Sequence, residues 1–469
     1  MTVTNDTPAI PNRAGRRVSF HTLGCKLNQA ETNAIAALFV QQGWQVVPFR
    51  NEADLTVINT CTVTGEADAK SRQAIRRAVR ASPRGKVAVV GCYVQVRPEE
   101  AASLEGVDLV LGTREKWRVL ELLDQLEGTR PDLPLVWVGD IGEAETYDEA
   151  PFISAATPSR CRTGRTRALL KVQEGCDYHC SYCIVPAARG RGRSRPLESC
   201  LEEARRLAAE GYCEIVLTGV NIGTWEEDGH CLHDLLAAVS EVEGLRRVRV
   251  SSIEPNLITD ELIRLAAERE NIAPHFHVPL QHSSDRVLKA MRRRYGIADY
   301  RAVLERIVAA LPDAAIGADV MVGFPGETEE DFRQLTGALT DLPLTYHHIF
   351  RYSERSGTVA SRMTPPSAGM TDAVDPVVRK ERSAVLHEIS RQRRREVARR
   401  SIGQTRLVHF ERPDGNGSWE GLTDNYLRVK VPVPTPLDDP FQPVRLTGYC
   451  NSTLLGNLSR LVGAPTRTA

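Results

Sequence analysis

The sequence predicts an α/β protein with three parts: an N-terminal open parallel α/β domain over residues 16–128, a central partial (β/α)6 barrel over residues 163–396, and a small β-barrel over residues 402–466. Strand patterns alternate with helix patterns as far as about residue 350, which is typical of parallel sheets. Six of these units follow one another in the central part, fewer than the eight of a closed TIM barrel. The last part has short strands between Gly, Pro, Asn and Asp turns, which favours a small barrel.

Length and composition limit the class of protein. A chain of 469 residues exceeds the size at which a single core keeps growing, so several domains are expected. Lys plus Arg equals Asp plus Glu, at 60 each, so the net charge gives no indication of a nucleic-acid partner. The odd count of eleven cysteines fits reduced thiols better than a disulfide framework. Without a membrane-length apolar stretch or a signal-peptide pattern, we expect a cytoplasmic monomer.

The N-terminal domain is expected to alternate strands and helices around one sheet. The predicted strands are Val18–Phe20, Leu55–Asn59, Lys86–Val90 and Leu109–Leu111, and the predicted helices are Asn28–Phe39, Ala67–Val79 and Glu115–Gln125. Residues 129–162 are rich in Pro, Gly and acidic residues, and we interpret them as a linker.

The central part is expected to contain six parallel strands, each followed by helical pattern. The strands are Ala168–Val172, Glu214–Leu217, Arg247–Ser251, His275–Pro279, Ala315–Val320 and Tyr346–Phe350. His275 and His277 share one strand face, but two such histidines without a carboxylate are a weak metal motif, so we interpret them as cleft lining. The last part is expected to contain the strands Thr405–Glu411, Tyr426–Val431 and Pro443–Tyr449.

The most informative motif is the CxxxCxxC run of Cys176, Cys180 and Cys183, directly after the first barrel strand. A cubane iron–sulfur cluster normally takes four thiolates, so three close together leave one iron open for another ligand. Zinc is the main alternative, because His179 lies within the run and could complete a four-ligand site. Three buried core cysteines are a further alternative, although the Asp, Tyr, His and Ser residues between them are uncommon in a hydrophobic core.

This run resembles the signature of the radical S-adenosylmethionine (SAM) superfamily. The resemblance implies a [4Fe–4S] cluster whose open iron binds SAM, and one electron from the cluster then splits SAM to give a 5′-deoxyadenosyl radical. Cofactor binding is assigned to five residues on the same face: Tyr182, Gly219, Asn221, Glu254 and Gln281. Where the family usually has Gln-Ser-Gly-Ser, this chain has Gln281-His282-Ser283-Ser284, so His282 takes the place of a small residue, which puts the shape near SAM in doubt.

Three further cysteines each lie just past a predicted strand of the N-terminal domain: Cys25, Cys61 and Cys92. The carboxyl ends of parallel strands share one edge, so these side chains could meet there. Three unrelated buried cysteines are equally compatible with their positions alone. The motifs Gly-Cys-Lys-Leu-Asn, Asn-Thr-Cys-Thr-Val and Gly-Cys-Tyr-Val-Gln resemble the N-terminal domain of the methylthiotransferase branch. That resemblance implies a second, auxiliary [4Fe–4S] cluster on these cysteines, and Glu31 matches the family's acidic position.

The C-terminal part resembles the TRAM module, an RNA-binding barrel of several tRNA-modifying enzymes. Arginines that alternate with Gly and Ser after the cysteine run form a local basic stripe, which favours RNA contact. The residues assigned to substrate binding are Arg189, Arg191, Arg193, Asp424, Asn425, Tyr426 and Arg428.

The family's reaction replaces a C–H bond by a methylthio group. Gly421–Val429 resembles the group that acts on N6-threonylcarbamoyladenosine at position 37 of tRNA, so we expect 2-methylthiolation of that nucleoside. Methylthiolation of N6-isopentenyladenosine or of a ribosomal-protein aspartate is the alternative within the branch. A non-enzymatic iron–sulfur sensor that binds RNA is the alternative from another class. The expected partners are the tRNA anticodon stem-loop, a cellular electron donor and a sulfur source.

Overall fold

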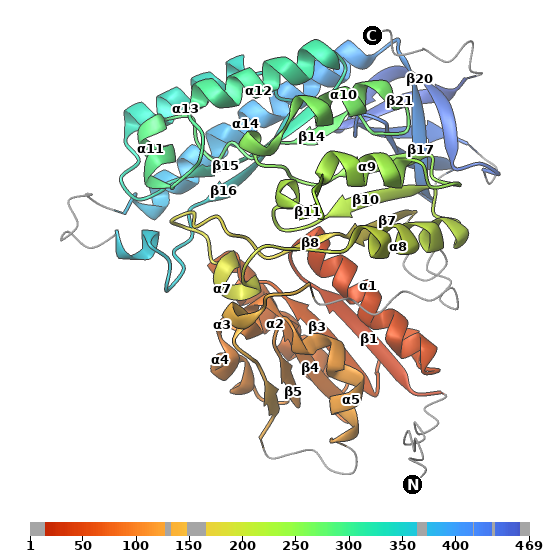
Figure 1. Ribbon diagram of the computed structural model, residues 1–469, viewed down its shortest axis with the longest axis vertical. Coiled ribbons are helices and arrows are strands. Elements are labelled where there is room, and N and C mark those ends of the chain that lie inside the picture. Colours follow the sequence, from red (N-terminus) through yellow and green to blue (C-terminus); the bar gives the residue numbers. More distant parts are fainter. Residues whose placement is uncertain are drawn as a thin grey trace. The chain divides into compact units, whose positions relative to one another are not determined.

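The computed structural model describes residues 15–126, 133–147, 166–363, 373–415, 417–433 and 437–459. The chain divides into two compact units (Figure 1). The first comprises residues up to Glu143 together with Ala187–Arg189, and the second contains most of the remaining chain. Within the described residues, no helix is both long and apolar enough to cross a bilayer.

The first unit is built on six parallel strands in the order β2-β1-β3-β4-β5-β6. The strands are β1 (Arg17–Thr22), β2 (Gln45–Val47), β3 (Leu55–Thr60), β4 (Lys86–Gly91), β5 (Leu109–Leu111) and β6 (Leu135–Trp137). The four predicted strands are all present. The sheet is wider than expected, because two three-residue edge strands are added. One of them, β6, lies within the segment predicted as a linker and pairs with β5, so residues 135–137 belong to the sheet.

Helices cover both faces of this sheet, as Figure 1 shows. They are α1 (Lys26–Gln41), α2 (Gly65–Ala81), α3 (Cys92–Val96), α4 (Pro98–Ala102), the 3-10 turn η1 (Glu115–Arg118) and α5 (Val119–Asp124). One apolar cluster joins α1 and α5 to one face of the strands, and a second joins α2 and α3 to the other. Strand β3 is therefore buried along its whole length, as expected for a parallel strand covered on both sides.

The second unit contains all six predicted barrel strands: β7 (Arg167–Lys171), β10 (Glu214–Thr218), β13 (Arg247–Val250), β14 (His275–His277), β15 (Ala315–Val322) and β16 (Tyr346–Arg351). They pair in parallel as two three-stranded sheets, β7-β10-β13 and β14-β15-β16. A parallel bridge between Ser252 and His277 connects the two sheets. The six strands thus follow one another in sequence order and form an open partial barrel.

Helices and short antiparallel strands connect these six strands. The helices are α7 (Val185–Arg189), α8 (Leu197–Ala209), α9 (Leu232–Ser240), α10 (Asp260–Glu268), α11 (Asp285–Ala290), α12 (Ile297–Ala310), α13 (Glu329–Asp341) and α14 (Pro376–Ser401), and the short strands are β8 (Gln173–Glu174), β9 (Arg193–Ser194), β11 (Glu226–Glu227) and β12 (His230–Cys231). The helix α13 begins at the N-cap Thr328, whose side chain accepts from the backbone of Asp331 while Asp331 caps Thr328 in return, a capping box.

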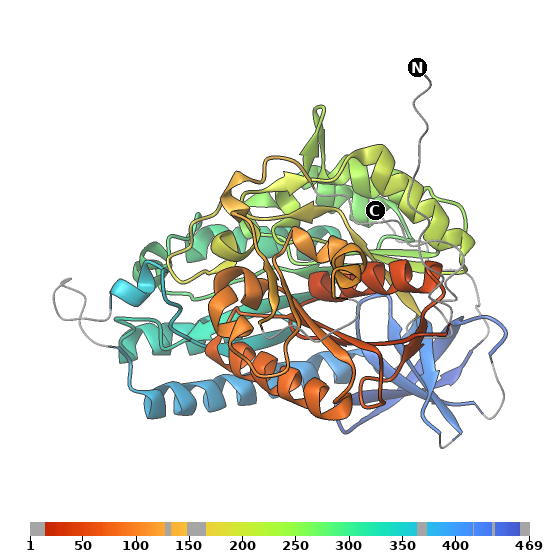
Figure 2. The ribbon, with the colours of Figure 1, turned by 90° about the horizontal axis from the view of Figure 1, so that it is seen from below.

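The chain ends in a closed five-stranded barrel with the order β17-β18-β19-β21-β20. Its strands are β17 (Thr405–Pro413), β18 (Ser418–Thr423), β19 (Arg428–Pro432), β20 (Phe441–Cys450) and β21 (Thr453–Leu458). Figure 2 shows α14 leading directly into this barrel. Two of the five strands, β18 and β21, were not predicted, because each contains a glycine, Gly421 or Gly456, which weakens the strand pattern.

The closed barrel packs against the starting ends of the central strands through a buried ionic cluster. Glu214, the first residue of β10, accepts from Arg249 Nε at 2.7 Å and contacts His409 Nδ1 at 2.8 Å and Arg247 at 3.5 Å. Arg249 and Arg247 also donate to carbonyls of Thr423 and Leu422. Burial alone would raise the pKa of Glu214, but Arg249, His409 and Arg247 together lower that pKa well below its usual range.

We expect Glu214→Gln to destabilise the second unit by about 3 kcal/mol, because it leaves two buried guanidinium groups without a counter-charge. Thermal unfolding at pH 7 measures the loss. Since the folded-state pKa lies below the unfolded value of about 4.3, the carboxylate stabilises fully above that pH and less below it. The difference from wild type should therefore shrink in acid.

The matched control is Glu198→Gln, which removes an exposed carboxylate paired with Arg205. Exposed pairs contribute little, so this variant should unfold like the wild type. Equal stability of the two variants at pH 7 would contradict the role given to Glu214.

Candidate iron–sulfur and cofactor site

The CxxxCxxC run forms a compact loop after β8, at the carboxyl end of the first barrel strand. The backbone N–H of Cys176 donates to Gly190, and that of Cys183 donates to Cys180, both at 3.0 Å. The three thiols lie close enough for their charges to interact. Burial raises the pKa of Cys183 to about 12, so this thiol gives up its proton only when a metal ion takes the thiolate.

Gln173 organises the backbone opposite this loop. Its side-chain oxygen accepts from the N–H groups of Val220 and Asn221, both at 2.9 Å. A Cβ at Gly219 would lie 2.9 Å from the Gln173 Cβ and 3.0 Å from its oxygen, so only glycine permits this approach. The predicted residues Gly219 and Asn221 are thereby brought beside the cysteine loop.

The surroundings of the Asn221 side chain show whether this site could hold SAM. Its side-chain nitrogen lies 3.8 Å from Cys176 Sγ. Its side-chain oxygen is buried and has no hydrogen-bond partner among the described residues. Buried polar atoms are normally paired, so this acceptor suits a donor brought by a ligand. The amino group of SAM is such a donor, and the residues present fit the cofactor.

A buried arginine connects the cysteine loop to the inside of the barrel. Arg293 donates to Cys180 Sγ at 3.3 Å and to the Tyr182 hydroxyl at 3.4 Å, and it forms a short ion pair with Glu254. Burial raises the pKa of Glu254, although Arg293 opposes that shift. Tyr182 and Glu254, both assigned to cofactor binding, therefore belong to one network with Cys180.

Gln281 and His282 lie at the end of β14. Gln281 has a left-handed backbone, with φ of 61°, and its backbone bonds to β15 on both sides. Such conformations in non-glycine residues often mark functional positions. His282 is fully buried, accepts from the Ser284 N–H and faces Glu327 at 3.7 Å. Burial lowers the pKa of His282 to about 4, so it is a neutral residue of the loop after β14 that packs beside Glu327 in the loop after β15.

The structure brings Cys25, Cys61 and Cys92 together at one edge of the N-terminal sheet. They follow β1, β3 and β4, which are neighbours in the sheet. Their thiols interact electrostatically. Burial raises the pKa of Cys61 to about 12. Gly24 lies so close that a Cβ there would be 2.9 Å from Cys61 Sγ.

Buried asparagines hold this edge in place. Asn28 donates to the carbonyls of Leu23 and Thr60, at 2.8 and 3.0 Å. Asn59 donates to the carbonyl of Asn28 at 2.9 Å. These bonds connect the loop after β1 to the end of β3, which fixes two of the three cysteine-bearing segments relative to each other.

Two buried cations accompany these cysteines. Arg189, which lies with the first unit, pairs with Glu31 at 2.9 Å and donates to Asn28 at 2.6 Å. Lys116 pairs with Glu31 at 2.7 Å. Two positive groups around one carboxylate leave a net positive charge, and Arg189 lowers the pKa of Cys92 against the larger effect of burial. Positive charge favours thiolates and hence metal binding.

The residues assigned to RNA binding are placed in different surroundings. Arg189 is occupied by its buried ion pair, and Arg193 is buried and donates to the Arg191 carbonyl. Arg191 is 79 % exposed. In the C-terminal barrel Arg428 is exposed. Of the four assigned arginines, Arg191 and Arg428 are therefore the exposed ones.

The loop before β19 is directed into the protein. Asn425 is buried and donates to the Asp313 carbonyl at 3.0 Å. The ring of Tyr426 lies 4.5 Å from that of His275 and 5.1 Å from the Arg249 guanidinium. Asp424 contacts Arg406 at 3.5 Å. Asn425 and Tyr426 thus contact the starting end of the central barrel, and Asp424 contacts the closed barrel itself; RNA contact by these three residues stays a prediction.

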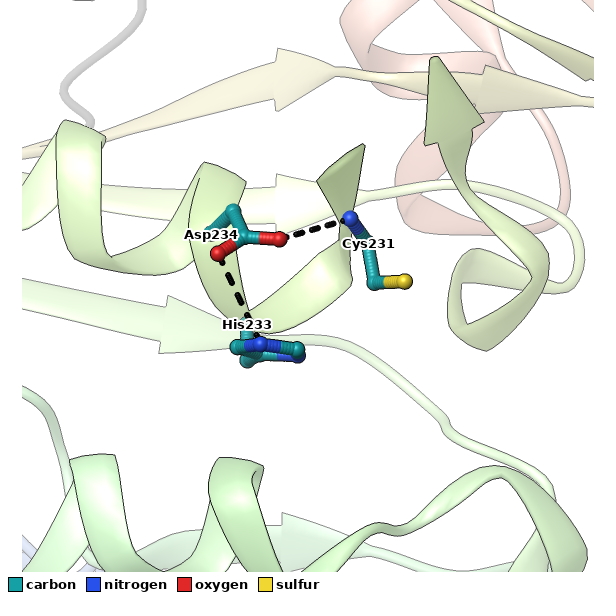
Figure 3. Close-up of side chains that lie close together, drawn as sticks. All are labelled: Cys231, His233 and Asp234. Atoms are coloured by element: carbon teal, nitrogen blue, oxygen red, sulfur yellow. Dashed lines mark hydrogen bonds and ion pairs between the residues drawn. The ribbon is translucent and has the colours of Figure 1, made fainter. Parts of the chain in front are cut away.

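Two other groups of side chains have metal-ligand chemistry: Cys231, His233 and Asp234, and His277, Asp319 and His348. Figure 3 shows the first at the start of α9. Asp234 accepts from the backbone nitrogen of Cys231 at 2.8 Å and lies 3.5 Å from His233. This is the geometry of a helix cap, and its exposed position gives it no link to the cysteine loop.

Sequence reasoning missed Gln173 and Arg293. Gln173 could have been suspected, because it immediately precedes the Glu-Gly-Cys turn. Arg293 lies in the run Arg292–Arg294, which has the appearance of a solvated basic segment. Only the fold shows that the middle arginine points inward, so no sequence signal distinguished it.

Comparison with known proteins agrees with this geometry. Residues 17–112 match the family described as "Uncharacterized protein family UPF0004", and residues 170–338 match the radical SAM superfamily. A radical SAM methyltransferase structure, TsrM from Kitasatospora setae, has a TM-score of 0.51 at 17% identity and covers 71% of this chain and 72% of that chain. At this identity the likeness supports the fold alone.

Curated relatives are more similar in sequence to this chain than that solved structure is. Threonylcarbamoyladenosine tRNA methylthiotransferase MtaB of Bacillus subtilis is 41% identical over 88% of this chain and 89% of its own length. The protein of the same name from Aquifex aeolicus is 38% identical over 88% and 96%. The tRNA-2-methylthio-N(6)-dimethylallyladenosine synthase of Methylacidiphilum infernorum is 32% identical over 94% of both.

The fold, the open three-cysteine loop and the matched domain define a radical SAM enzyme. Within that superfamily, the chain belongs to the methylthiotransferase family.

Gly24→Ala tests the auxiliary set. The added methyl group would collide with Cys61, and the left-handed backbone at φ 95° disfavours any side chain. After anaerobic reconstitution we expect about four irons per chain instead of about eight, while SAM cleavage continues. Iron analysis measures the change.

Gly337→Ala in α13 is the matched control, because nothing lies within 4 Å of its added Cβ. It should hold as much iron as the wild type. A Gly24→Ala protein with full iron would contradict the placement of the cluster beside Cys61.

Proposed function

We propose that this protein attaches a methylthio group to C2 of N6-threonylcarbamoyladenosine in tRNA. The observation that carries the proposal is the pair of three-cysteine sets, one in each unit, each at the carboxyl edge of parallel strands. A cluster with an open iron binds a reacting partner, and one such site makes a radical while the other delivers sulfur.

Two [4Fe–4S] clusters are proposed, with SAM on the barrel cluster. Cys176, Cys180 and Cys183 would hold the first, and Cys25, Cys61 and Cys92 the second. When bound, these groups supply the carbon radical, the inserted sulfur and the methyl group, which ordinary acid–base chemistry cannot provide at a C–H bond. Asn221 orients the amino acid part of SAM, Arg293 stabilises the Cys180 thiolate, and Arg189 stabilises the auxiliary thiolates.

The choice of substrate rests on the relatives. The two at 41% and 38% identity are named for threonylcarbamoyladenosine, whereas the relative named for dimethylallyladenosine is 32% identical. We assign residues 16–128 to the auxiliary cluster, 163–396 to radical chemistry and 402–466 to RNA binding. The anticodon stem-loop would contact Arg191 and Arg428. We further propose that the protein is a cytoplasmic monomer that uses a cellular electron donor and a sulfur source.

Variants of the two cysteine sets should separate the two clusters. Cys180→Ala should abolish SAM cleavage, because radical formation needs the barrel cluster. Cys61→Ala should still cleave SAM but attach no sulfur. Anaerobic assays of 5′-deoxyadenosine and of modified RNA measure both, and Cys231→Ala, an exposed cysteine outside both sets, serves as control. Sulfur attachment by the Cys61 variant would refute the auxiliary site.

Mass spectrometry of tRNA nucleosides tests the substrate. Cells that lack the protein should lose 2-methylthio-N6-threonylcarbamoyladenosine and regain it on complementation. Loss of the 2-methylthio form of isopentenyladenosine instead would identify the alternative substrate. An unchanged nucleoside profile, with no 5′-deoxyadenosine formed in vitro, would favour an iron–sulfur sensor.

A further inference from the structure

Three polar side chains from adjacent strands of the central barrel meet at one point. Asp319 Oδ1 lies 3.0 Å from His277 Nε2 and 3.2 Å from His348 Nδ1. Asp319 and His348 are direct partners across β15 and β16, and His277 comes from β14 on the other side of β15. The neighbouring His347 is buried while His348 is 52 % exposed, as expected for residues that point to opposite faces of a strand.

This cluster is rigidly supported from one side. The Tyr346 hydroxyl lies 3.3 Å from His277 Nδ1 and 2.8 Å from His275 Nε2. Tyr426 stacks behind His275. The partner on Nδ1 fixes the orientation of the His277 ring, so its other nitrogen faces Asp319.

The other side of the cluster is open to a ligand. Among the described residues, Asp319 Oδ2 and His348 Nε2 have no hydrogen-bond partner. Burial opposes ionisation of Asp319, but contact with His277 and His348 lowers its pKa well below the usual range, so the carboxylate is charged. The cluster thus presents a strong acceptor beside an imidazole nitrogen that donates when the ring is protonated.

The cluster belongs to the same inner face as the cysteine loop. Glu254, which pairs with Arg293, interacts electrostatically with Asp319. Arg293 in turn contacts Cys180. Arg293 thus connects the cysteine loop to Glu254, and Glu254 and Asp319 interact through their charges.

We propose that Asp319 and His348, held by His277, recognise the polar substituent on N6 of the target adenosine and so select threonylcarbamoyladenosine over hydrocarbon-substituted adenosines. This inference rests on the proposed function and deepens it. The threonylcarbamoyl group offers ureido N–H and hydroxyl donors for Asp319 and a carboxylate for His348. A dimethylallyl group offers neither, and its entry would leave Asp319 Oδ2 without a donor.

This kind of selection is strong. A site built to hydrogen-bond a substrate rejects an analogue that lacks the polar group by far more than a purely apolar pocket rejects one additional polar group. Two imidazoles and one carboxylate could also bind a divalent metal ion, which is the alternative interpretation of this cluster. One nitrogen of each imidazole, in His277 and His348, already contacts Asp319 Oδ1 directly, so these groups do not need an ion between them.

The test uses reconstituted holoenzyme and three synthetic anticodon stem-loops of one sequence. These carry adenosine, N6-dimethylallyladenosine or N6-threonylcarbamoyladenosine at the target position. Each is assayed for kcat/KM of methylthiolation and for Kd. We expect the wild type to prefer the threonylcarbamoyl RNA, and His348→Ser and Asp319→Asn to lose about tenfold or more of that preference, with Kd for unmodified RNA unchanged.

Controls keep the outcomes distinct. His233→Ser removes a partly exposed imidazole in the helix-cap group and should keep the full preference. Iron content and thermal unfolding confirm that each variant folds. A wild type that modifies the threonylcarbamoyl RNA, with both variants equally selective, would overturn the inference and leave the proposed function standing. Selectivity that appears only on addition of Zn²⁺ would make the cluster a metal site and also overturn it. A wild type inactive on threonylcarbamoyl RNA would defeat the proposed function itself.

Discussion

The site depends on one constraint: a parallel sheet places the carboxyl ends of all its strands at the same edge. Cys25, Cys61 and Cys92 are far apart in sequence and meet only because β1, β3 and β4 are neighbours that run in the same direction. For the same reason, the cysteine loop, Asn221 and Gln281 lie at the carboxyl ends of the central barrel strands. An antiparallel strand at any of these positions would send its end, and the side chain that follows it, to the opposite edge.

The two cysteine sets share an electrostatic arrangement. Each has a buried arginine paired with a glutamate: Arg189 with Glu31 in the first unit, and Arg293 with Glu254 in the second. The carboxylate compensates the cost of burying the guanidinium. It also fixes the orientation of the guanidinium beside the thiols. Fixed positive charge favours the anionic sulfur ligands that a cluster requires.

Local sequence pattern predicted most helices and strands, but it did not predict the edge strands or the side-chain directions that depend on tertiary contacts. All six barrel strands and four of the six N-terminal strands followed from the alternation of strand and helix patterns; β3, for example, carries Leu55, Val57 and Ile58 in a strand that is buried throughout. The edge strands β2 and β6 have three residues each and were missed, whereas the equally short β5 and β14 were found. Pairing with the neighbouring strand, β1 or β5, defines these two edge strands. The cysteines were identifiable by spacing and motif. The direction of Arg293, and the inward turn of Tyr426, depend on contacts between segments far apart in sequence.

The two ends of the central barrel have different roles. At the starting end, Tyr426, Asn425 and the Glu214 cluster make contacts between the closed barrel and the central barrel, whereas the cysteine loop lies at the carboxyl ends of the central strands. On that side Arg293 contacts Cys180 and pairs with Glu254, whose charge acts on Asp319. Asp319 contacts His277, and the other nitrogen of that ring contacts Tyr346. Under the proposed function, a base beside the cysteine loop would direct its N6 substituent toward this polar cluster, so that one orientation of the nucleoside would serve both reaction and recognition.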